Sequence, residues 1–397
     1  MIRQRITSQQ VEEFESVLEC DTSKVRRTYA TKITVIRQRA LITLKQLIKK
    51  LCYIIGFAFL FVTIIAPLAF RHSTFIRRNM IFMNWLNVPL YRNLSTPEES
   101  FGLNCTKNFY ITTQDGMTLG MWHVLPKSRL GDCDVNNLER IDERIEFADN
   151  RPVIYYVHGN GGARGGPHRK ELYKMLAYTD NLDYHVVAVD YRGYGDSTNV
   201  SPSVDGVVSD AAAGYFWLLD KLKGDSRRVT VWGHSLGTAI STYVVSRLQN
   251  VHQPSGLLLE SPFNTIGDAV RDHPFSVAFR WLPYFESMFV DPVVASEVTN
   301  FDTQSKIEHV SCPLLILHAV DDHIVPYQLG VRLYRHALEA RTKQHSAGDT
   351  HLPLPKFITF DAKYNYGHKN IYLDKEMPNI MAGFVTYKGD VVKPIKN

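Results

Sequence analysis

Apolar residues follow two alternating patterns along this chain from residue 109 onward. Short runs rich in valine, isoleucine, leucine and tyrosine are separated by longer segments with helical spacing. The expected strands are 109–113, 119–124, 153–157, 185–190, 229–232, 256–260, 313–318 and 357–360, and the expected helices are 169–178, 205–223, a segment after 235, one from about 328 and one over 370–387. Apolar strands that alternate with helices form mainly parallel sheets covered on both faces. We therefore expect one doubly wound α/β domain, whose first two strands are an antiparallel pair.

A different pattern precedes this domain. Leu51 to Phe70 is a run of twenty residues without a charge, and about 20 apolar residues in a helix cross the hydrocarbon core of a bilayer. A buried core helix is the alternative, but such a uniformly apolar segment is uncommon in a core. A cleaved signal peptide has only a short segment before its apolar region, whereas fifty residues precede this one. We therefore expect a retained membrane anchor.

Basic residues are concentrated before the apolar segment. Residues 1–50 hold 11 of the 45 Lys and Arg and 5 of the 40 Asp and Glu, which leaves 34 basic and 35 acidic residues for the rest of the chain. The later part has no basic excess, and this argues against nucleic-acid binding. By the positive-inside rule, the N-terminus is expected in the cytosol and the large C-terminal part in a lumen or outside the cell.

Two further features bear on the compartment. Sequons for N-glycosylation occur at Asn93, Asn104 and Asn199, all on the translocated side of the expected anchor. Three cysteines also lie on that side, where one pair could form a disulfide, and their spacing matches no zinc site. They are Cys105, Cys133 and Cys312, and the pair Cys105–Cys133 is only a first guess.

These patterns divide the chain into four parts. We expect a basic cytosolic segment over 1–50, a transmembrane anchor over 51–70, a juxtamembrane linker over 71–108 and the α/β domain over 109–397. Within the domain, 127–150 is polar and without a clear period, which is typical of a surface loop. Residues 261–312 interrupt the strand–helix rhythm and are expected to form a cap.

The sequence GHSLG places Ser235 where the strand 229–232 gives way to a helix. A sharp strand-to-helix turn needs small residues two positions on either side of the serine, and Gly233 and Gly237 supply them. The alternative is a glycine-rich turn with a capping serine. Because the motif stands in the correct strand–turn–helix context, we interpret Ser235 as a nucleophile.

A nucleophilic serine needs a base and an acid. In α/β domains whose serine lies at a strand–turn–helix elbow, the acid and then the histidine follow the serine in the chain. His368 lies in a loop between the last expected strand and the last helix, and it is the expected base. His234 is expected to point away from the site. Asp322, which stands shortly after the strand 313–318, is the preferred acid, but Glu260 at the end of 256–260 could reach the same imidazole. Asp321, the neighbour of Asp322, could merely cap the turn.

Attack by Ser235 on an acyl carbon creates an oxyanion that needs at least two hydrogen-bond donors. One is expected to be the backbone N–H of Leu236, and the other that of Asn160 in the glycine-rich loop HGNGG. This loop lacks the spacing of a phosphate-binding motif. The chemistry implies neither a metal nor an organic cofactor.

The expected cap is rich in aromatic residues. Phe275, Phe279, Trp281 and Phe285 could form an apolar surface that accepts an acyl chain, although ordinary packing on the core would use the same residues. A charged lipid head group would also need cationic donors. The candidates are Arg164, His168, Arg169 and Arg280.

Several stretches together resemble the α/β-hydrolase superfamily and, within it, the membrane-anchored lysophosphatidylserine and monoacylglycerol lipases. They are HGNGG, DYRGYGDS, GHSLGT, LESPF, HPFS, CPLLILHAVDDHIVP and YGHKNIY, and the likeness runs from about residue 87 to the last helix. The resemblance implies the α/β-hydrolase fold after one transmembrane helix. It also implies a serine hydrolase whose nucleophile, acid and base match Ser235, Asp322 and His368, facing the lumen of the endoplasmic reticulum.

The sequence therefore predicts a membrane-anchored serine hydrolase that cleaves acyl esters of lysophospholipids and monoacylglycerols through an acyl-enzyme. The same residues could instead serve an acyl-protein thioesterase or a small peptidase. A catalytically inactive hydrolase fold that acts as a binding module is the alternative from another class. That alternative would be marked by loss of Ser235, the acid or His368, and all three are present.

Overall fold

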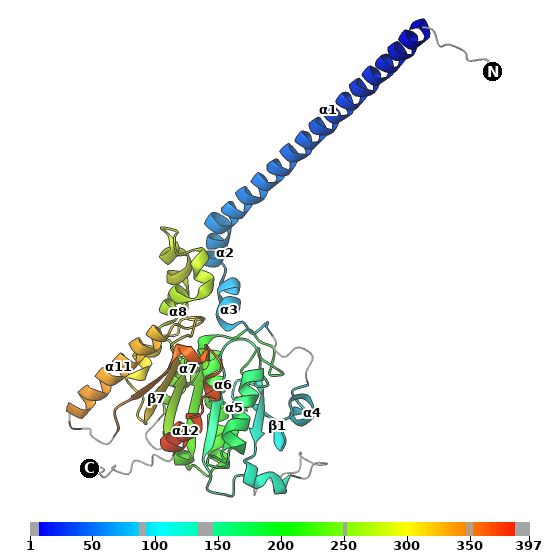
Figure 1. Ribbon diagram of the computed structural model, residues 1–397. Helices are drawn as coiled ribbons and strands as arrows, with labels where there is room; N and C mark the ends of the chain where they lie inside the picture. Colours follow the sequence, from blue (N-terminus) through cyan, green and yellow to red (C-terminus); the bar gives the residue numbers. More distant parts are fainter. Residues whose placement is uncertain are drawn as a thin grey trace, which may run out of the picture. The chain divides into compact units, whose positions relative to one another are not determined.

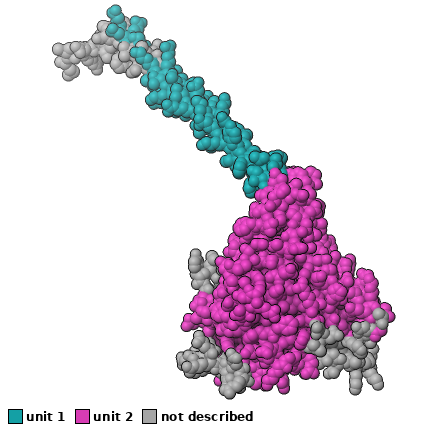
Figure 2. Space-filling view, turned by 180° about the vertical axis from the view of Figure 1, so that it is seen from behind, with its two compact units in different colours: residues 1–66 teal, residues 67–397 magenta. Residues whose placement is uncertain are grey.

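The computed structural model describes residues 8–86, 93–133, 146–248, 252–346, 348 and 352–385. The chain divides into two compact units, residues 1–66 and residues 67–397 (Figure 2). In the first unit, helix α1 covers Ser8–Leu60 and a π-helical turn follows at Phe61–Ile65. The stretch Lys24–His72 contains one helix long and apolar enough to cross a membrane. The side chains of 24–60 are all exposed.

The second unit is built on an eight-stranded sheet with the order β1-β2-β4-β3-β5-β6-β7-β8 (Figure 1). The strands are β1 Thr106–Thr112, β2 Thr118–Val124, β3 Val153–Val157, β4 His185–Val189, β5 Val229–His234, β6 Gly256–Glu260, β7 Leu314–Ala319 and β8 Lys356–Phe360. The pairs β1·β2 and β2·β4 are antiparallel, and the remaining five pairs are parallel. This architecture confirms the expected doubly wound α/β fold.

Helices cover both faces of the sheet, because the side chains of each strand point alternately to its two sides. In β3, Tyr155 packs with α6 and α7, whereas Tyr156 packs with α5. One layer contains α6 Val204–Lys221, α7 Leu236–Ser246 and α11 Tyr327–Ser346; the other contains α4 Pro97–Phe101, α5 Pro167–Tyr178 and α12 Met377–Val385. The sheet is thus buried on both sides.

Two boundaries differ from the expected ones. Strand β1 begins at Thr106 rather than at 109. The last helix begins at Met377 rather than near 370, after a short 3-10 turn at Ile371–Leu373. Pro378 explains the late start, because proline is tolerated in the first turn of a helix but disrupts its interior. The end of the expected helix, 386–387, and residues 134–145 of the expected loop 127–150 lie outside the described residues.

Short helices form the interruption between β6 and β7. They are α8 Ile266–Asp272, 3-10 turn Pro274–Ala278, π turn Glu286–Val290, α9 Asp291–Val294 and α10 Thr303–Ile307. The segment just before the sheet is also helical, with α2 Ala66–His72 and α3 Thr74–Phe82. In the second unit, the ring of Phe70 lies 5.1 Å from that of Phe289, which joins this segment to the cap. Phe70, expected at the end of the anchor, and Ile76, Ile81 and Phe82, expected in the linker, therefore pack as part of the domain.

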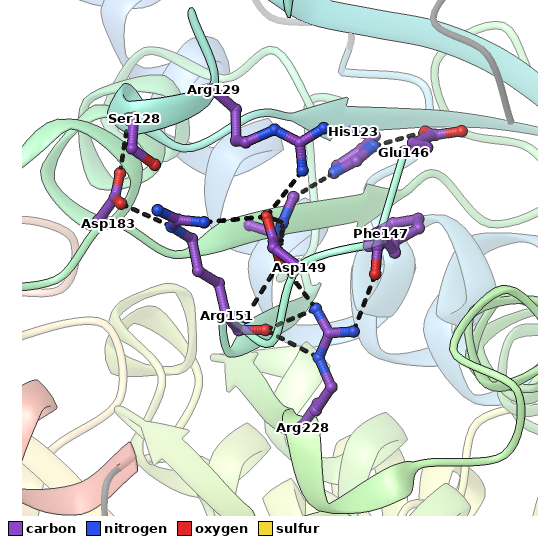
Figure 3. Close-up of polar contacts among 10 residues, drawn as sticks. His123, Ser128, Arg129, Glu146, Phe147, Asp149, Arg151, Asp183 and Arg228 are labelled. Carbon is purple, nitrogen blue, oxygen red and sulfur yellow. Dashed lines mark hydrogen bonds and ion pairs between the residues drawn. The ribbon is translucent and has the colours of Figure 1, made fainter. Parts of the chain in front are cut away.

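A charged cluster anchors the chain at the amino ends of the parallel strands (Figure 3). Asp149 pairs with Arg129 at 2.9 Å, with Arg228 at 3.1 Å and with His185 at 3.1 Å. Arg228 also donates to the backbone carbonyls of Phe147 and Arg151. Ser235 follows the carboxyl end of β5, so this cluster lies at the opposite edge of the sheet. Its role is to fix the segment before β3.

The same edge carries a disulfide between Cys105 and Cys133, whose Cα atoms are 5.8 Å apart. The pairing agrees with the first guess from sequence, and Cys312 is buried and free. The disulfide closes a loop of sequence separation 28 between β1 and the turn after β2. Disulfides persist in oxidising compartments, which bears on where the domain functions.

Candidate active site

Ser235 lies at a sharp turn between β5 and α7. Its backbone has φ 52° and ψ −120°, a region that residues with a side chain rarely adopt. A Cβ on Gly233 would stand 2.3 Å from the Oγ of Ser241, and one on Gly237 would stand 2.0 Å from the carbonyl oxygen of Val157. Only glycine fits at both positions, because the turn presses strand β5, helix α7 and the end of β3 together. Strain of this kind is characteristic of functional sites.

Three side chains from three loops form one hydrogen-bonded chain at this turn. Nε2 of His368 lies 2.9 Å from Oγ of Ser235, and Nδ1 of His368 lies 2.7 Å from Oδ2 of Asp322. All three residues are buried. Ser235 follows β5, Asp322 follows β7 and His368 follows β8, so the carboxyl ends of parallel strands bring them to one edge of the sheet.

The environment of Asp322 keeps its carboxylate ionised. Its Oδ1 accepts hydrogen bonds from the backbone N–H groups of Ile324 and Val325, each at 2.9 Å. Burial alone would raise the pKa of Asp322, but the charge of His368 and hydrogen bonds from His318 and His368 hold this pKa well below its usual range. The carboxylate can therefore stabilise an imidazolium at position 368.

The two other acidic candidates have different partners. Glu260 accepts a hydrogen bond from Nε1 of Trp232 at 2.9 Å, and burial raises its pKa to about 7. A carboxyl group with this pKa is only about half ionised near neutral pH, and it is therefore a weaker partner for an imidazolium than the fully ionised Asp322. Asp321 accepts from the backbone N–H of Gly367 at 2.9 Å and so holds the loop that carries His368.

His234 does not point away from the site, which corrects the expectation from sequence. Its Nε2 donates to the backbone carbonyl of His368 at 2.8 Å, and the two ring centroids are 5.0 Å apart. Strand β5 continues through His234, so this side chain lies on the same face of the sheet as Trp232. If the expected strand 229–232 had been extended to residue 234, its alternation would have placed the His234 side chain on the side of Trp232. His234 positions the backbone of His368.

The two expected oxyanion donors lie beside Ser235. Leu236 is the first residue of α7, and the first N–H groups of a helix have no partner within it. Asn160, Ser235 and Leu236 line the same cavity. Arg169 fixes the loop that carries Asn160, because its guanidinium donates to the backbone carbonyls of Gly159, Gly161 and Ala163.

An apolar cavity of about 140 Å³ opens beside Ser235. Phe275 and Phe279 from the cap line it, but Trp281 and Phe285 do not. Trp281 is 60% exposed, and Phe285 is buried behind Phe289 with its ring 5.5 Å away. Even a regular helix would have placed Trp281 and Phe285 on a different side from Phe275 and Phe279, because six and ten residues from Phe275 do not complete whole turns at 3.6 residues per turn.

Residues from the segment after the apolar helix form another wall of this cavity. Phe70, Met80 and Ile81 line it together with the cap, and Arg77 ties the segment together by donating to the carbonyl of Phe70 at 3.0 Å. None of these three residues was expected at the site from the sequence. The apolar face of 74–82 was the available signal, but nothing in the sequence indicated what it packs against.

A second cavity of about 240 Å³ meets the apolar one at Ser235. Much of its surface is apolar, but we call it the polar cavity because two cationic side chains and several histidines line it. Two of the four cationic candidates, His168 and Arg169, line it together with the unanticipated Lys369. The other two lie elsewhere. Arg164 is fully buried and pairs with Asp190 at 2.6 Å, and the exposed side chain of Arg280 donates to the backbone carbonyls of 272 and 273.

The three sequon asparagines, Asn93, Asn104 and Asn199, are all exposed. A side chain must be accessible to carry a glycan, and these three meet that condition. As for metals, no group of three or more His, Cys, Asp or Glu side chains that could hold an ion occurs in the described ranges.

Comparison with known proteins places the chain in a family. A family model described as the alpha/beta hydrolase fold matches residues 152–272. The chain is 38% identical to "Lysophosphatidylserine lipase ABHD12" of Danio rerio, over 80% of this chain and 79% of that one. It is 40% identical to the protein of the same name from Rattus norvegicus, over 78% and 74% of the two chains.

Among solved structures, the Pyrococcus furiosus esterase Pf2001 covers 76% of this chain and 96% of its own, with a TM-score of 0.52 and 20% identity. This likeness concerns the fold alone. The relatives found by sequence assign the family, because more than a third of the aligned residues are identical over more than two thirds of each chain. The chain belongs to the ABHD12 family of α/β hydrolases.

Proposed function

We propose that this protein is a serine hydrolase that cleaves the acyl ester of lysophospholipids, with lysophosphatidylserine as the first candidate, and of monoacylglycerols. The observation that carries the proposal is the position of Ser235 Oγ, which is hydrogen-bonded to His368 where an apolar and a polar cavity meet. An ester of a fatty acid with a polar alcohol likewise has an apolar part and a polar part on the two sides of the bond that is cleaved. The names of the relatives support lysophosphatidylserine as the substrate.

In the first step, Oγ of Ser235 attacks the ester carbonyl carbon while Nε2 of His368 takes the hydroxyl proton. The backbone N–H groups of Leu236 and Asn160 stabilise the oxyanion, and Asp322 stabilises the imidazolium. The carbon–oxygen bond to the glycerol then breaks, and His368 returns the proton to the departing alkoxide. For lysophosphatidylserine this leaving group is glycerophosphoserine.

In the second step, water attacks the acyl-enzyme. His368 takes a proton from the water, the bond to Ser235 breaks, and the proton returns to Oγ as the fatty acid leaves. The apolar cavity beside Ser235 is suited to the acyl chain. A dry apolar cavity of about 150 Å³ accepts a group the size of benzene, so a long chain requires the cavity to open further toward the cap and residues 70–81.

The apolar helix over 24–72 supports a single-pass membrane protein. We place the catalytic domain on the lumenal side of the endoplasmic reticulum. The basic residues before the span, the disulfide and the three exposed sequons support this orientation. We expect the protein to carry glycans that endoglycosidase H removes. We also expect these glycans to be lost when the three asparagines are replaced by glutamine. A protein without glycans, whose domain is digested by protease outside sealed microsomes, would place it in the cytosol instead.

The activity is tested with the full-length protein in membranes. A fluorophosphonate probe is expected to label Ser235 and not to label the Ser235→Ala variant. Lysophosphatidylserine and a monoacylglycerol are expected to slow labelling and to be hydrolysed, whereas glycerophosphoserine, which has no acyl chain, should not protect. An acyl-thioester peptide that competes better than both lipids would favour the thioesterase alternative. Absence of labelling in folded protein would favour a binding module.

A further inference from the structure

The polar cavity beside Ser235 is lined by positive and neutral groups only. Arg169, Lys369 and three histidines, His168, His234 and His273, line it together with residues of the glycine-rich loop. No Asp or Glu side chain belongs to its lining. The cavity also faces the start of α5, since Gly166, Pro167 and His168 contribute to its wall. The N-terminus of a twelve-residue helix adds partial positive charge there.

Arg169 is a buried cation without an acidic partner. It is 2% exposed, and no carboxylate lies within 4.0 Å of it among the residues that the structure describes. Its guanidinium donates to three backbone carbonyls, and its Nε has no hydrogen-bond partner in the described part of the chain. A buried charge in this state is costly unless an anion approaches it.

His168 adds a second unsatisfied group to the same wall. Its Nε2 is buried and has no hydrogen-bond partner within the described ranges. Burial, followed by the charge of Arg169, lowers the pKa of His168 well below its usual range, so the ring is neutral near neutral pH. A neutral imidazole can still donate one hydrogen bond to an anion. Buried polar atoms without partners are unusual in native proteins.

Lys369 is the cation that can meet a ligand directly. It follows His368 in the chain, its side chain is exposed, and it forms no ion pair or hydrogen bond with other described residues. Arg169 cannot serve in this way, because its donors already hold the carbonyls of the glycine-rich loop. Although Lys369 is reached by solvent, partial desolvation where it meets the cavity, followed by the charge of Arg169, lowers its pKa.

We propose that the polar cavity binds the anionic group of the lipid head group, and that Lys369 contacts this anion and thereby sets the preference for charged over neutral acylglycerols. The inference rests on the proposed function and specifies its substrate. The phosphodiester and the carboxylate of lysophosphatidylserine share this chemistry. Both are acceptors that pair with an ammonium in a partly desolvated site.

The test compares full-length wild-type protein with Lys369→Gln, which removes the charge, and Lys369→Arg, which keeps it. The matched control is Lys375→Gln, which removes the charge of an exposed lysine that does not line the cavity. Lysophosphatidylserine, lysophosphatidate and a monoacylglycerol with the same acyl chain are the substrates. Lysophosphatidate has the phosphate but no carboxylate, and so identifies the group that is bound.

We expect Lys369→Gln to lower the ratio of kcat/KM for lysophosphatidylserine to that for the monoacylglycerol by about tenfold, as for loss of one hydrogen bond to a charged group. Lys369→Arg should restore most of the ratio, and Lys375→Gln should not change it. An equal fall for lysophosphatidate would assign the phosphate as the bound group. A fall for lysophosphatidylserine alone would assign the carboxylate. An unchanged ratio in Lys369→Gln would overturn the proposal while leaving the lipase function intact.

A second measurement does not depend on turnover. Lysophosphatidate is expected to slow fluorophosphonate labelling of Ser235 in the wild type, and to protect about tenfold less well in Lys369→Gln. Labelled protein that hydrolyses neither lipid would contradict the proposed function. In that case, equal protection in both variants would also overturn the anion site, whereas weaker protection in Lys369→Gln would support it.

Discussion

Asp322→Asn is expected to lower kcat for the ester substrate by about 10⁴-fold, whereas Glu260→Gln should change it by only a few fold. An amide at 322 can still accept the N–H groups of Ile324 and Val325, but its NH₂ group then faces Nδ1 of His368. That contact favours the tautomer with hydrogen on Nε2, which cannot accept the proton of Ser235.

Glu260→Gln is the matched control, because it makes the same chemical change at the competing acid. The glutamine carbonyl can keep the hydrogen bond from Trp232 Nε1. The measurement is single-turnover hydrolysis in detergent, with folding of each variant checked by thermal unfolding. A large loss in Glu260→Gln, with activity retained in Asp322→Asn, would assign the acid to Glu260 and contradict the geometry of the site.

The second large effect concerns the turn itself. Gly237→Ala is expected to lower the free energy of unfolding by about 3 kcal/mol, the upper end of the usual cost of overpacking. The new Cβ would lie 2.0 Å from the carbonyl oxygen of Val157 and 2.7 Å from that of His158. Both obstacles are backbone atoms, so helix α7 and Ser235 must move. Labelling of Ser235 by a fluorophosphonate should also slow at temperatures where the variant is folded.

Gly383→Ala provides the control for this change. Gly383 lies in α12, and nothing stands within 4 Å of the position of its added Cβ. Alanine in place of glycine within a helix is expected to stabilise the protein by about 0.5–1 kcal/mol. Thermal unfolding of both variants in the same detergent gives the comparison. If Gly237→Ala were as stable and as readily labelled as Gly383→Ala, the turn would not require its glycine.

The ABHD12 relatives and the structure bear on different parts of the function. The relatives, which align over about four fifths of the chain, assign the family and suggest a lipid substrate. The geometry adds a division of labour, with an apolar cavity suited to the acyl chain and a positively charged one suited to the head group. If both assignments hold, Ser235 meets the ester bond at their junction.

Much of the fold and of the reacting groups could be predicted from the sequence alone. Strands and helices follow from periodic burial, which contiguous residues record, and the turn at Ser235 follows from glycines two residues away on each side. His368 could be selected because chain order in this fold restricts the base to a late loop. Each of these inferences depends on short stretches or on the order of elements.

Only the tertiary structure decided the contacts between distant segments. It selected Asp322 over Glu260 by bringing one carboxylate to 2.7 Å from His368 and the other to Trp232. It also brought Phe70 and Ile81 to the apolar cavity, and Lys369 to the polar one. Composition and spacing do not determine these outcomes, because the lining of a cavity depends on how side chains from several elements pack together.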